Sequence, residues 1–366
     1  MNQQALLYYL ALQQAEGVGA VIAKKLLVHC GSAEAVFKEK TMQLSKISGI
    51  GSKVTHALKN KTLFEAAEKE LAFISKNNII CQLITDESYP EKLKHCPDAP
   101  IVLFSKGAID LKNKKIISIV GTRNITNYGK EVLEALIADL LIFNPVIVSG
   151  LAYGIDIFAH QLAIKNNLQT IAVLAHGLDR IYPSAHQKAA VHMQENGGLM
   201  TEYWSGTNPD KENFIKRNRI IAGLSEATIV IESASKGGSL ITAGIANSYN
   251  RDVFAVPGKL SDKYSVGCNN LIKTNQAALY SGVADLAYLL NWETKTITKS
   301  VQKQLFVQLD NEEASIYEFL NTNGKQQLDL IALQCKMPIF KTVTILFNLE
   351  LKGMVKPLPG KLYQAI

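Results

Sequence analysis

Short apolar runs rich in β-branched residues recur along residues 115–290, and helical patterns of ten or more residues separate most of them. A continuous apolar run of this length is typical of a strand that is buried on both faces. Alternation of such strands with helices predicts an α/β domain with a doubly wound, mostly parallel sheet. The candidate strands are Ile116–Val120, Val146–Val148, Thr170–Leu174, Thr228–Ile231 and Val253–Val256.

The segment before the sheet shows helical patterns. In residues 1–65, two glycine turns, Glu16–Gly19 and Ser48–Ser52, each precede a helix that carries lysine. The spacing is similar to that of helix-hairpin-helix modules, whose turns can present backbone N–H groups to a phosphate. The alternative is that glycine only closes tight turns in a helical bundle. Residues 66–110 then lead into the sheet through an amphipathic helix and a strand near Pro100–Phe104.

The end of the chain predicts a separate small module. A polar linker at 291–304 precedes residues 305–366, where two helical segments are followed by a longer helix that ends at Gly353. Two short strands come last, which completes the pattern of a winged helix. The predicted elements before and after the long helix are Ser315–Asn321, Leu328–Gln334, Met354–Lys356 and Leu362–Ala365, with a turn at Pro359-Gly360.

Composition narrows the class of protein. With 366 residues and 47% hydrophobic positions, the chain can build two or three domains with a large core. Its net charge of +7 permits an anionic partner without proving one. Five scattered cysteines without a Cys-x-x-Cys pair indicate neither a disulfide framework nor a zinc site, so we expect a cytoplasmic protein. The longest apolar region, Val132–Ala152, is interrupted by charged residues and a proline, so no membrane span is expected.

Four strand ends of the predicted sheet carry glycine beside small hydroxyl or basic residues. In open α/β sheets, ligands bind beyond the carboxyl ends of the strands. Glycine lets backbone amides approach a phosphate closely, and the N-termini of helices favour its negative charge. The four loops together predict a phosphate-binding edge. They are Gly121–Asn124, Ser149–Asp156, His176–Arg180 and Glu232–Ser239.

Two side chains add the means to hold a nucleic acid. Arg123 directly follows a buried strand, and its guanidinium can bind a phosphate with two hydrogen bonds or stack on a base. The alternative is an ion pair, but its loop contains no acidic residue. Phe214 shares one side of a helix with Arg217 and could stack a base, which is worth about 1–3 kcal/mol. Spacing alone leaves open whether Phe214 is instead a core residue. Lys211, one turn earlier, could neutralise a phosphate.

Motifs of common enzymes are missing. The chain has no Gly-x-x-x-x-Gly-Lys-Ser/Thr loop, no Gly-x-Gly-x-x-Gly turn after the first parallel strand and no Gly-x-Ser-x-Gly elbow. Asp156 and His160 lack a third metal ligand, which favours a first-turn role for Asp156. His176 and Asp179 lack a nucleophile, which favours loop structure over acid–base catalysis. We expect no catalytic residue, metal or cofactor.

These residues closely resemble the DNA-processing protein A (DprA/Smf) family of natural transformation. The resemblance covers residues 115–290, about half of the chain, and the segments on either side also match that family's arrangement. It rests on many matches in the same order: Ile119–Arg123, Ser149–Asp156 with Ala159-His160, Gly177–Asp179 with Tyr182-Pro183, Arg217–Ser225, Gly238–Ala243, Arg251–Gly258 and Gly267–Ile272.

The resemblance implies an extended Rossmann-like domain that binds single-stranded DNA without catalysis. It also implies a homodimer that protects incoming strands and helps to load the RecA recombinase during natural transformation. We expect a helical domain of the helix-hairpin-helix or SAM-like type at 1–65, the Rossmann-like domain at 66–290, the linker at 291–304 and a winged-helix-like domain at 305–366.

The resemblance also assigns residues. By position, Arg123 matches the family's DNA-gripping arginine, and Lys211 and Phe214 match its lysine and base-stacking phenylalanine. Asn269–Leu279 falls where the family's subunits meet, which implies interface residues Asn270, Ile272 and Leu279. The full set of predicted DNA-binding residues adds the phosphate-pocket positions and two arginines of the basic helix: Ser149, Gly150, Gly238, Ser239, Arg217 and Arg219.

The chain departs from the family's pattern at a few positions. Ser184 and His186 stand where the family often has lysine and asparagine, so a basic contact there is not expected unless Lys188 supplies it. Ile215 stands where the family usually has proline. The final module has few basic residues with which to read DNA, which leaves a protein contact or internal packing as its alternatives: Lys341, Lys352, Lys356 and Lys361.

Two other functions were weighed. The fold also resembles nucleotide phosphoribohydrolases of the lysine-decarboxylase-like group, which carry Pro-Gly-Gly-x-Gly-Thr followed by a catalytic glutamate. This chain has Lys236–Ala243 at that place, with no glutamate through Ala246, so the carboxylate is missing. A protein adaptor for which DNA contact is incidental is the remaining alternative.

Overall fold

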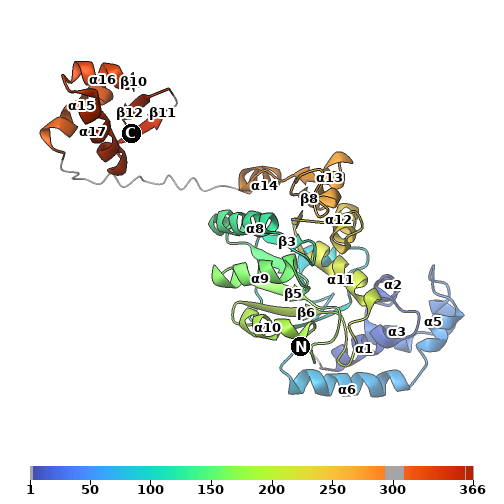
Figure 1. The fold of residues 1–366 in the computed structure, drawn as a ribbon. Coiled ribbons are helices and arrows are strands. Elements are labelled where there is room, and N and C mark those ends of the chain that lie inside the picture. The colour runs from blue at the N-terminus through green and yellow to red at the C-terminus, as the bar shows by residue number, and fades with distance from the viewer. Residues whose placement is uncertain (1–2, 293–308, 359, 366) are drawn as a thin grey trace. The chain divides into compact units, whose positions relative to one another are not determined.

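The computed structural model describes residues 3–292, 309–358 and 360–365. These residues form two compact units, one on each side of residues 293–308 (Figure 1). The predicted linker at 291–304 lies outside the described residues except for its first two positions. One of these, Trp292, is buried, and its ring packs against Phe143 with 5.1 Å between the ring centroids. The first unit therefore extends at least to Trp292.

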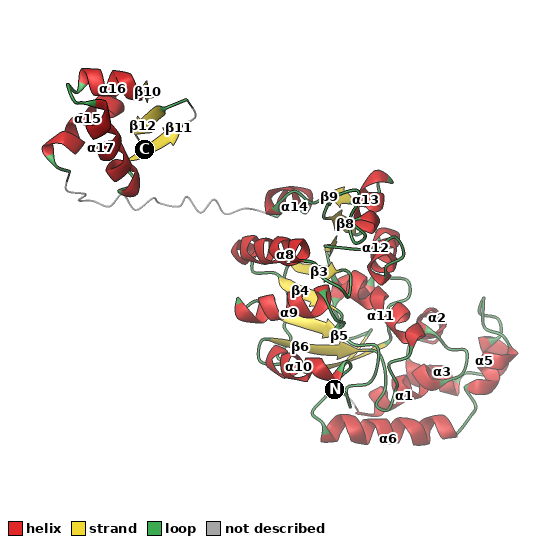
Figure 2. Cartoon of the chain, viewed as in Figure 1, coloured by secondary structure: helices red, strands yellow, loops and turns green. Residues whose placement is uncertain are grey.

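A nine-stranded sheet forms the centre of the first unit, in the order β1-β2-β6-β5-β4-β3-β7-β8-β9. Figure 2 shows its neighbouring strands β6, β5, β4 and β3. Strands β3 to β9 are parallel, whereas β2 is antiparallel to both β1 and β6. This confirms the doubly wound, mostly parallel sheet. The strands are β1 (Ile80–Leu83), β2 (Val102–Gly107), β3 (Ile116–Val120), β4 (Val146–Ser149), β5 (Thr170–Val173), β6 (Gly197–Thr201), β7 (Ala227–Val230), β8 (Asp252–Ala255) and β9 (Ala278–Leu279).

Alternate residues of strand β3 enter two different cores, one on each face of the sheet. Ile117 and Ile119 pack with helices α8 and α9, whereas Ile116 and Val120 lie in the core that contains α11 and α12. Both faces are therefore covered, as a parallel sheet requires. The helical segments of this region are α7 (Glu91–Lys94), α8 (Asn127–Leu140), η1 (Leu141–Phe143), α9 (Ile155–Lys165), η2 (Ser184–His186), α10 (Gln187–Met193), α11 (Lys211–Leu224), α12 (Gly238–Ser248), α13 (Val266–Lys273) and α14 (Val283–Leu289).

Strand β6 was not predicted from the sequence, because glycines stand where β-branched residues would mark a strand. Gly197 has a φ of +131°, and a Cβ there would lie 2.1 Å from Thr170 O. A Cβ at Gly198 would lie 2.2 Å from Lys106 O. The neighbouring strands β5 and β2 approach these two positions so closely that only glycine fits.

Six helices at the start of the chain share the apolar core of α11 and α12. Gly19 and Gly51 are the N-cap residues of α2 and α5, so both predicted turns lead into helices. Lys53 of α5, directly after the second turn, forms an ion pair of 2.7 Å with Glu16 of the first turn. The helices are α1 (Gln3–Gln14), α2 (Ala20–Cys30), α3 (Ala33–Lys38), α4 (Thr41–Leu44), α5 (Ser52–Ala57) and α6 (Thr62–Lys76), so the domain boundary predicted at residue 65 falls within α6.

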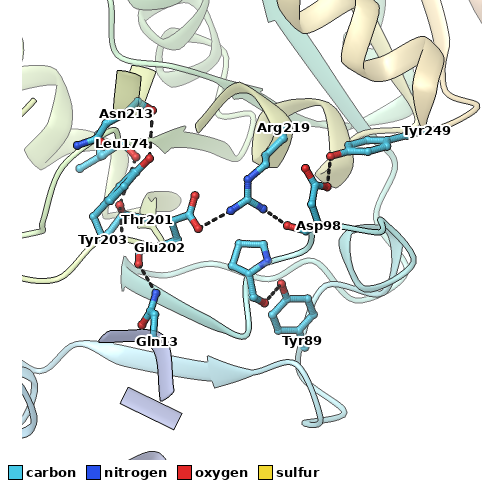
Figure 3. A network of polar contacts seen from close by, with 11 residues as sticks. Gln13, Tyr89, Asp98, Leu174, Thr201, Glu202, Tyr203, Asn213, Arg219 and Tyr249 are labelled. Atoms are coloured by element: carbon cyan, nitrogen blue, oxygen red, sulfur yellow. Dashed lines mark hydrogen bonds and ion pairs between the residues drawn. The ribbon is translucent and has the colours of Figure 1, made fainter. Parts of the chain in front are cut away.

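A network of polar contacts fastens these helices to the α/β domain (Figure 3). Gln13 of α1 donates to Glu202 O (2.7 Å) and accepts from the indole of Trp204 (3.0 Å). On α11, the Arg219 guanidinium donates to the Glu202 carboxylate and to Asp98 O. Because these groups are mostly buried, the network holds the N-terminal helices in a fixed place against the sheet.

The second unit has the three helices and the hairpin that were predicted for a winged helix. Gly353, with a φ of +69°, follows the last helix as expected. Two of the four lysines considered for DNA contact are in ion pairs of 2.5 Å, Lys341 with Glu312 and Lys352 with Glu313. The elements are α15 (Asn311–Asn323), β10 (Gln326–Gln327), α16 (Leu328–Gln334), α17 (Ile339–Leu351), β11 (Val355–Leu358) and β12 (Leu362–Ala365); Pro359 of the predicted turn lies outside the described residues.

Among the described residues, no single helix has both the length and the apolar character needed to cross a membrane. Helices α16 and α17 meet this test of length and composition only when taken together, and they are bent by 106° at the break between them.

Candidate nucleic-acid interface

A groove of about 640 Å³ lies at the carboxyl ends of the parallel strands. Its walls come from the loop after β3, the first three turns of α11, and the loop after β7 with the start of α12. This is the edge at which the sequence predicted a ligand. The groove brings together segments that are more than a hundred residues apart in the chain. Figure 1 shows β3, α11 and α12, which carry these segments.

The loop that carries Arg123 is held from two sides. At its start, Thr122 N donates to Glu232 O (2.8 Å). At its end, the Glu232 carboxylate accepts from Thr126 N (2.9 Å) and Thr126 Oγ1 (2.5 Å). Gly154, with a φ of +79°, packs behind the loop, where a Cβ would lie 2.3 Å from Thr122 O. These contacts fix the backbone of Arg123 before any ligand binds.

Three cations of the groove are exposed: Arg123, Lys211 at the start of α11, and Lys236 in the loop after β7. None of them has an ion-pair partner among the described residues, in contrast to Arg180 and Arg219. Unpaired cations at the rim of a concave surface raise the local concentration of anions. They are therefore free to neutralise phosphates.

Phe214 is a groove residue and not a core residue. It is partly exposed and belongs to none of the buried clusters of the described residues. The ring of Tyr182 lies beside the Phe214 ring, with 5.9 Å between the two centroids, and Arg217 Cζ lies 5.7 Å from the centroid of the Phe214 ring. The spacing had left open whether Phe214 is a core residue, and the structure places its ring at the groove instead.

The loop after β7 presents a helix N-terminus to the groove. Gly237 is the N-cap of α12, and a Cβ at this position would lie 2.3 Å from Ser233 Oγ. Ser239 Oγ donates to Ser233 Oγ (2.9 Å), which closes the loop on itself. Gly238 is exposed, and a Cβ added to it would meet no atom within 4 Å. The backbone N–H groups at this end of α12 are thus open to a phosphate.

A buried pair of opposite charges forms the floor of the groove. Arg217 is only 5% exposed, and its guanidinium donates to Val173 O. Burial raises the pKa of Asp156, and the nearby Arg217 opposes that rise. A Cβ on Gly150 would lie 2.5 Å from Asp156 Oδ2 and 2.8 Å from Arg217 Nη2, so glycine is needed there for packing. The pair stabilises the floor but offers little charge to a ligand.

Six of the nine predicted DNA-binding residues line this groove: Arg123, Lys211, Phe214, Arg217, Gly238 and Ser239. The other three do not. Ser149 is buried and its hydroxyl donates to Ile119 O (2.6 Å), while Gly150 O lies 2.5 Å from His160 Nε2. Arg219 faces away from the groove on α11, where it binds Glu202 and Asp98 (Figure 3). These three positions support the groove from behind.

Of the polar residues that had suggested a metal or a catalyst, Asp156, His160 and Asp179 have structural partners. His176 Nδ1 lies 2.8 Å from Gly177 O, but its buried Nε2 has no hydrogen-bond partner among the described residues. Asp156 lies in the first turn of α9, as expected, and His160 is buried. Asp179 accepts from Gly206 N (3.1 Å) and from Arg180, which confirms its place in loop structure. No group of three or more His, Cys, Asp or Glu side chains that could hold a metal occurs in the described part of the chain.

Some groove residues had no role assigned from the sequence: Asn124, Tyr182, Ile241 and Thr242. Tyr182 belongs to the Tyr182-Pro183 pair that the family resemblance covers, but it lies well after the end of β5 at Val173, so the strand end did not mark it. Ile241 and Thr242 follow the glycine loop by less than one helical turn, so their position is a consequence of where α12 begins. Asn124 left no distinguishing pattern.

Comparison with known proteins identifies the family. The sequence model of DNA recombination-mediator protein A matches residues 78–291, which is more than half of the chain. The chain belongs to this family. The model of the DprA winged helix domain also matches, over residues 304–361.

Relatives of this family cover most of the chain. Protein Smf of Synechocystis is 32% identical over 98% of both chains. DNA processing protein DprA of Bacillus subtilis is 43% identical over 62% of this chain and 77% of its own length. Among solved structures, the X-ray structure of DprA from Streptococcus pneumoniae is 35% identical, with a TM-score of 0.64 over 77% of this chain and 97% of that one.

One further structure concerns a ligand. DNA processing protein A from Helicobacter pylori is 29% identical, with a TM-score of 0.53 over 59% of this chain and 97% of that one. The structure is described as giving insight into that protein's single-stranded DNA-binding mode. Together with the family, this confirms the extended Rossmann-like fold and the resemblance that the sequence indicated.

Proposed function

We propose that this protein binds single-stranded DNA in the groove between β3, α11 and α12. The observation that carries the proposal is that Arg123, Phe214 and the N-terminus of α12 line one groove. A guanidinium and backbone amides suit phosphates, and an exposed ring suits a base. The family and the single-stranded DNA-binding mode described for the Helicobacter pylori relative support the same ligand.

The aromatic residue favours a single strand over a duplex. Bases in a duplex are stacked on each other, so a ring from the protein reaches a base face only after unstacking, which costs a few kcal/mol. In a single strand the base faces are already available. Stacking and phosphate contacts carry little sequence information, so we expect weak sequence preference.

The groove does not support the phosphoribohydrolase alternative. Asp156 is the one carboxylate among its lining residues, and it is buried beside Arg217. Glu232, just after β7, is 2% exposed, and its carboxylate accepts hydrogen bonds from the backbone and the hydroxyl of Thr126. No exposed carboxylate of the groove is therefore placed to stabilise a ribosyl cation, and we propose a function without catalysis. Release of free base from nucleoside monophosphates would be the result that restores the enzyme.

We further propose that the chain acts as a homodimer through β9 and α13. Strand β9 is the last of the sheet and, within the described part of the chain, pairs with β8 alone. Leu279 on this edge is 47% exposed, Asn270 on α13 is exposed and Ile272 is partly buried. An edge strand with an exposed apolar side chain is suited to meet a second copy. From the family we also propose that the chain protects incoming strands and helps to load the RecA recombinase during natural transformation. The location proposed for these roles is the cytoplasm.

The proposal is tested by fluorescence titration of labelled oligothymidylate and of a matched duplex. We expect the native protein to prefer the single strand and Phe214→Ala to lose about 1–3 kcal/mol of binding free energy to it. The control is Phe158→Ala, which removes a ring that packs under the other face of the sheet. Equal affinity for both nucleic acids, together with an unchanged affinity of Phe214→Ala, would contradict a single-strand groove.

A further inference from the structure

The groove does not end at α11. A second hollow lies between α11, α12 and the turn at Pro97-Asp98, and it shares Ile215 with the groove. A third hollow lies on helix α2 and shares Val21 and Pro97 with the second. The three depressions therefore form one continuous path from the phosphate loop to the N-terminal helices.

The chemistry of this path matches that of the groove. Its exposed apolar side chains include Val28 at 85%, Val21 at 45% and Ile215 at 44%. Such side chains offer apolar contact to bases, including the methyl group of thymine. Lys25 on α2 and Lys216 on α11 are exposed beside them and supply positive charge for phosphates.

Acidic groups near the path are partly neutralised. Glu212 lies one turn before Lys216, and their charged atoms are 4.0 Å apart. Asp98 accepts a hydrogen bond from the Tyr249 hydroxyl, so its carboxylate is tied to α12 (Figure 3). Among the residues that line the second and third hollows, Lys24, Lys25, Lys216 and Arg219 are basic and Asp98 alone is acidic, so the lining favours an anion.

The path is also rigid. Lys24 of α2 donates to Cys96 O (2.8 Å) and to Lys94 O (3.3 Å), which fixes α2 against the turn at Pro97-Asp98. From the other side, Arg219 donates to Asp98 O and so joins this turn to α11. Preorganised surfaces lose less entropy when they bind a flexible strand.

We propose that the single strand held in the groove continues along this path, so that helix α2 of the N-terminal helices is part of the DNA-binding surface. This inference rests on the function proposed above. It places the contact on the face of α2 that carries Val21, Lys25 and Val28, and not on the glycine turns. A protein partner would use the apolar side chains equally well, but continuity with the groove and the exposed lysines favour the strand.

The test compares two oligothymidylates, of about 5 and about 16 nucleotides, which span the usual range of single-strand site sizes. The variants are Lys25→Glu, Val28→Asn and Lys216→Glu in the full chain, and Lys165→Glu at the end of α9 is the control for added negative charge. The substituted side chains are exposed, so folding should be retained, and circular dichroism checks this.

We expect each path variant to weaken binding of the long oligonucleotide by about fivefold or more while changing the short one by less than about twofold. Lys165→Glu should leave both affinities unchanged. If the three path variants bind the long oligonucleotide as the native protein does, the inference is wrong, and the path is then available to a protein partner.

The same titrations separate this inference from the function on which it rests. Arg123→Ala should weaken the binding of both lengths. If Arg123→Ala binds both lengths normally, the groove itself is not the DNA site. If Arg123→Ala is weak and the path variants are normal, the groove stands and only its extension fails.

Discussion

At the scale of the residue, the sequence predicted which side of a helix a residue occupies. It did not predict which atoms the side chain contacts. Phe214 and Arg217 were placed on one side of a helix, and both line the groove. Their burial differs, since Phe214 is partly exposed while Arg217 is 5% exposed and serves as its floor. That difference depends on Asp156 of α9 and Val173 of β5, which are far away in the chain, so no local pattern could show it.

His160, beneath the groove, gives a prediction for pH dependence. Its Nε2 lies 2.5 Å from Gly150 O and its Nδ1 lies 2.7 Å from Thr170 Oγ1. Because a carbonyl oxygen only accepts, Nε2 carries a proton. Burial lowers the pKa of His160 from 6.5 to about 4.

Proton uptake by the unfolded chain determines whether the free energy of unfolding rises or falls with pH. Between pH 6.5 and about pH 4 the unfolded chain binds a proton at His160 that the native protein does not. The free energy of unfolding should therefore fall as the pH falls through this range, by about 3 kcal/mol in total at 1.36 kcal/mol per pKa unit. Urea unfolding of the native protein and of His160→Asn at about pH 7 and about pH 5 measures it. The same pH dependence in both proteins would show that His160 is not the source.

At the scale of the element, strand ends were the most predictable feature. The five strands predicted within residues 115–290 are all present, because each is a short apolar run of β-branched residues between helical patterns. Strand β6 was missed, since Gly197 and Gly198 are required by neighbouring backbones and not by strand propensity. The loops that line the groove could be identified once the strands were known, because each loop directly follows a predicted strand.

Helix α12 gives a prediction at this scale. Gly238→Ala should not disturb the fold, since the added Cβ meets no atom within 4 Å. It should weaken single-strand binding by about tenfold, because a methyl group at the N-terminus of α12 keeps a phosphate from its backbone amides. Fluorescence titration of the oligonucleotide measures the loss.

Gly244 on the same helix is the matched control. A Cβ there also meets no atom within 4 Å, and Gly244 is exposed but does not line the groove. Gly244→Ala should raise the free energy of unfolding by about 0.5–1 kcal/mol and leave DNA binding unchanged. If both glycine variants bind the strand equally well, α12 does not receive a phosphate.

At the scale of the whole molecule, the sequence indicated which kinds of domain are present. It did not indicate how the N-terminal helices are joined to the α/β domain. The helical start, the sheet and the winged helix were all predicted. The sequence did not show that the N-terminal helices share a core with α11 and α12, because Gln13 and Trp204, which help to join them, are 191 residues apart. Contacts over such separations depend on the whole fold.

The predicted dimer belongs to this scale. Leu279→Asp places a charge on the exposed side of β9, and we expect it to convert a dimer into monomers because a buried unpaired carboxylate is costly. Light scattering of the native and variant proteins measures the mass. Ile142→Asp, which changes an exposed residue of η1, is the control and should remain dimeric. A native protein that is monomeric at all concentrations would exclude this interface.

The salt dependence of single-strand binding by native protein and Arg123→Ala is the most direct measure of the groove. If Arg123 grips one phosphate, its loss should lower the affinity by about tenfold or more and reduce the magnitude of the slope of log K against log salt by about 0.7. Lys165→Ala, which removes one positive charge from the end of α9, should leave the slope as it is. An Arg123→Ala protein with native affinity and native slope would contradict the claim that a strand lies in this groove.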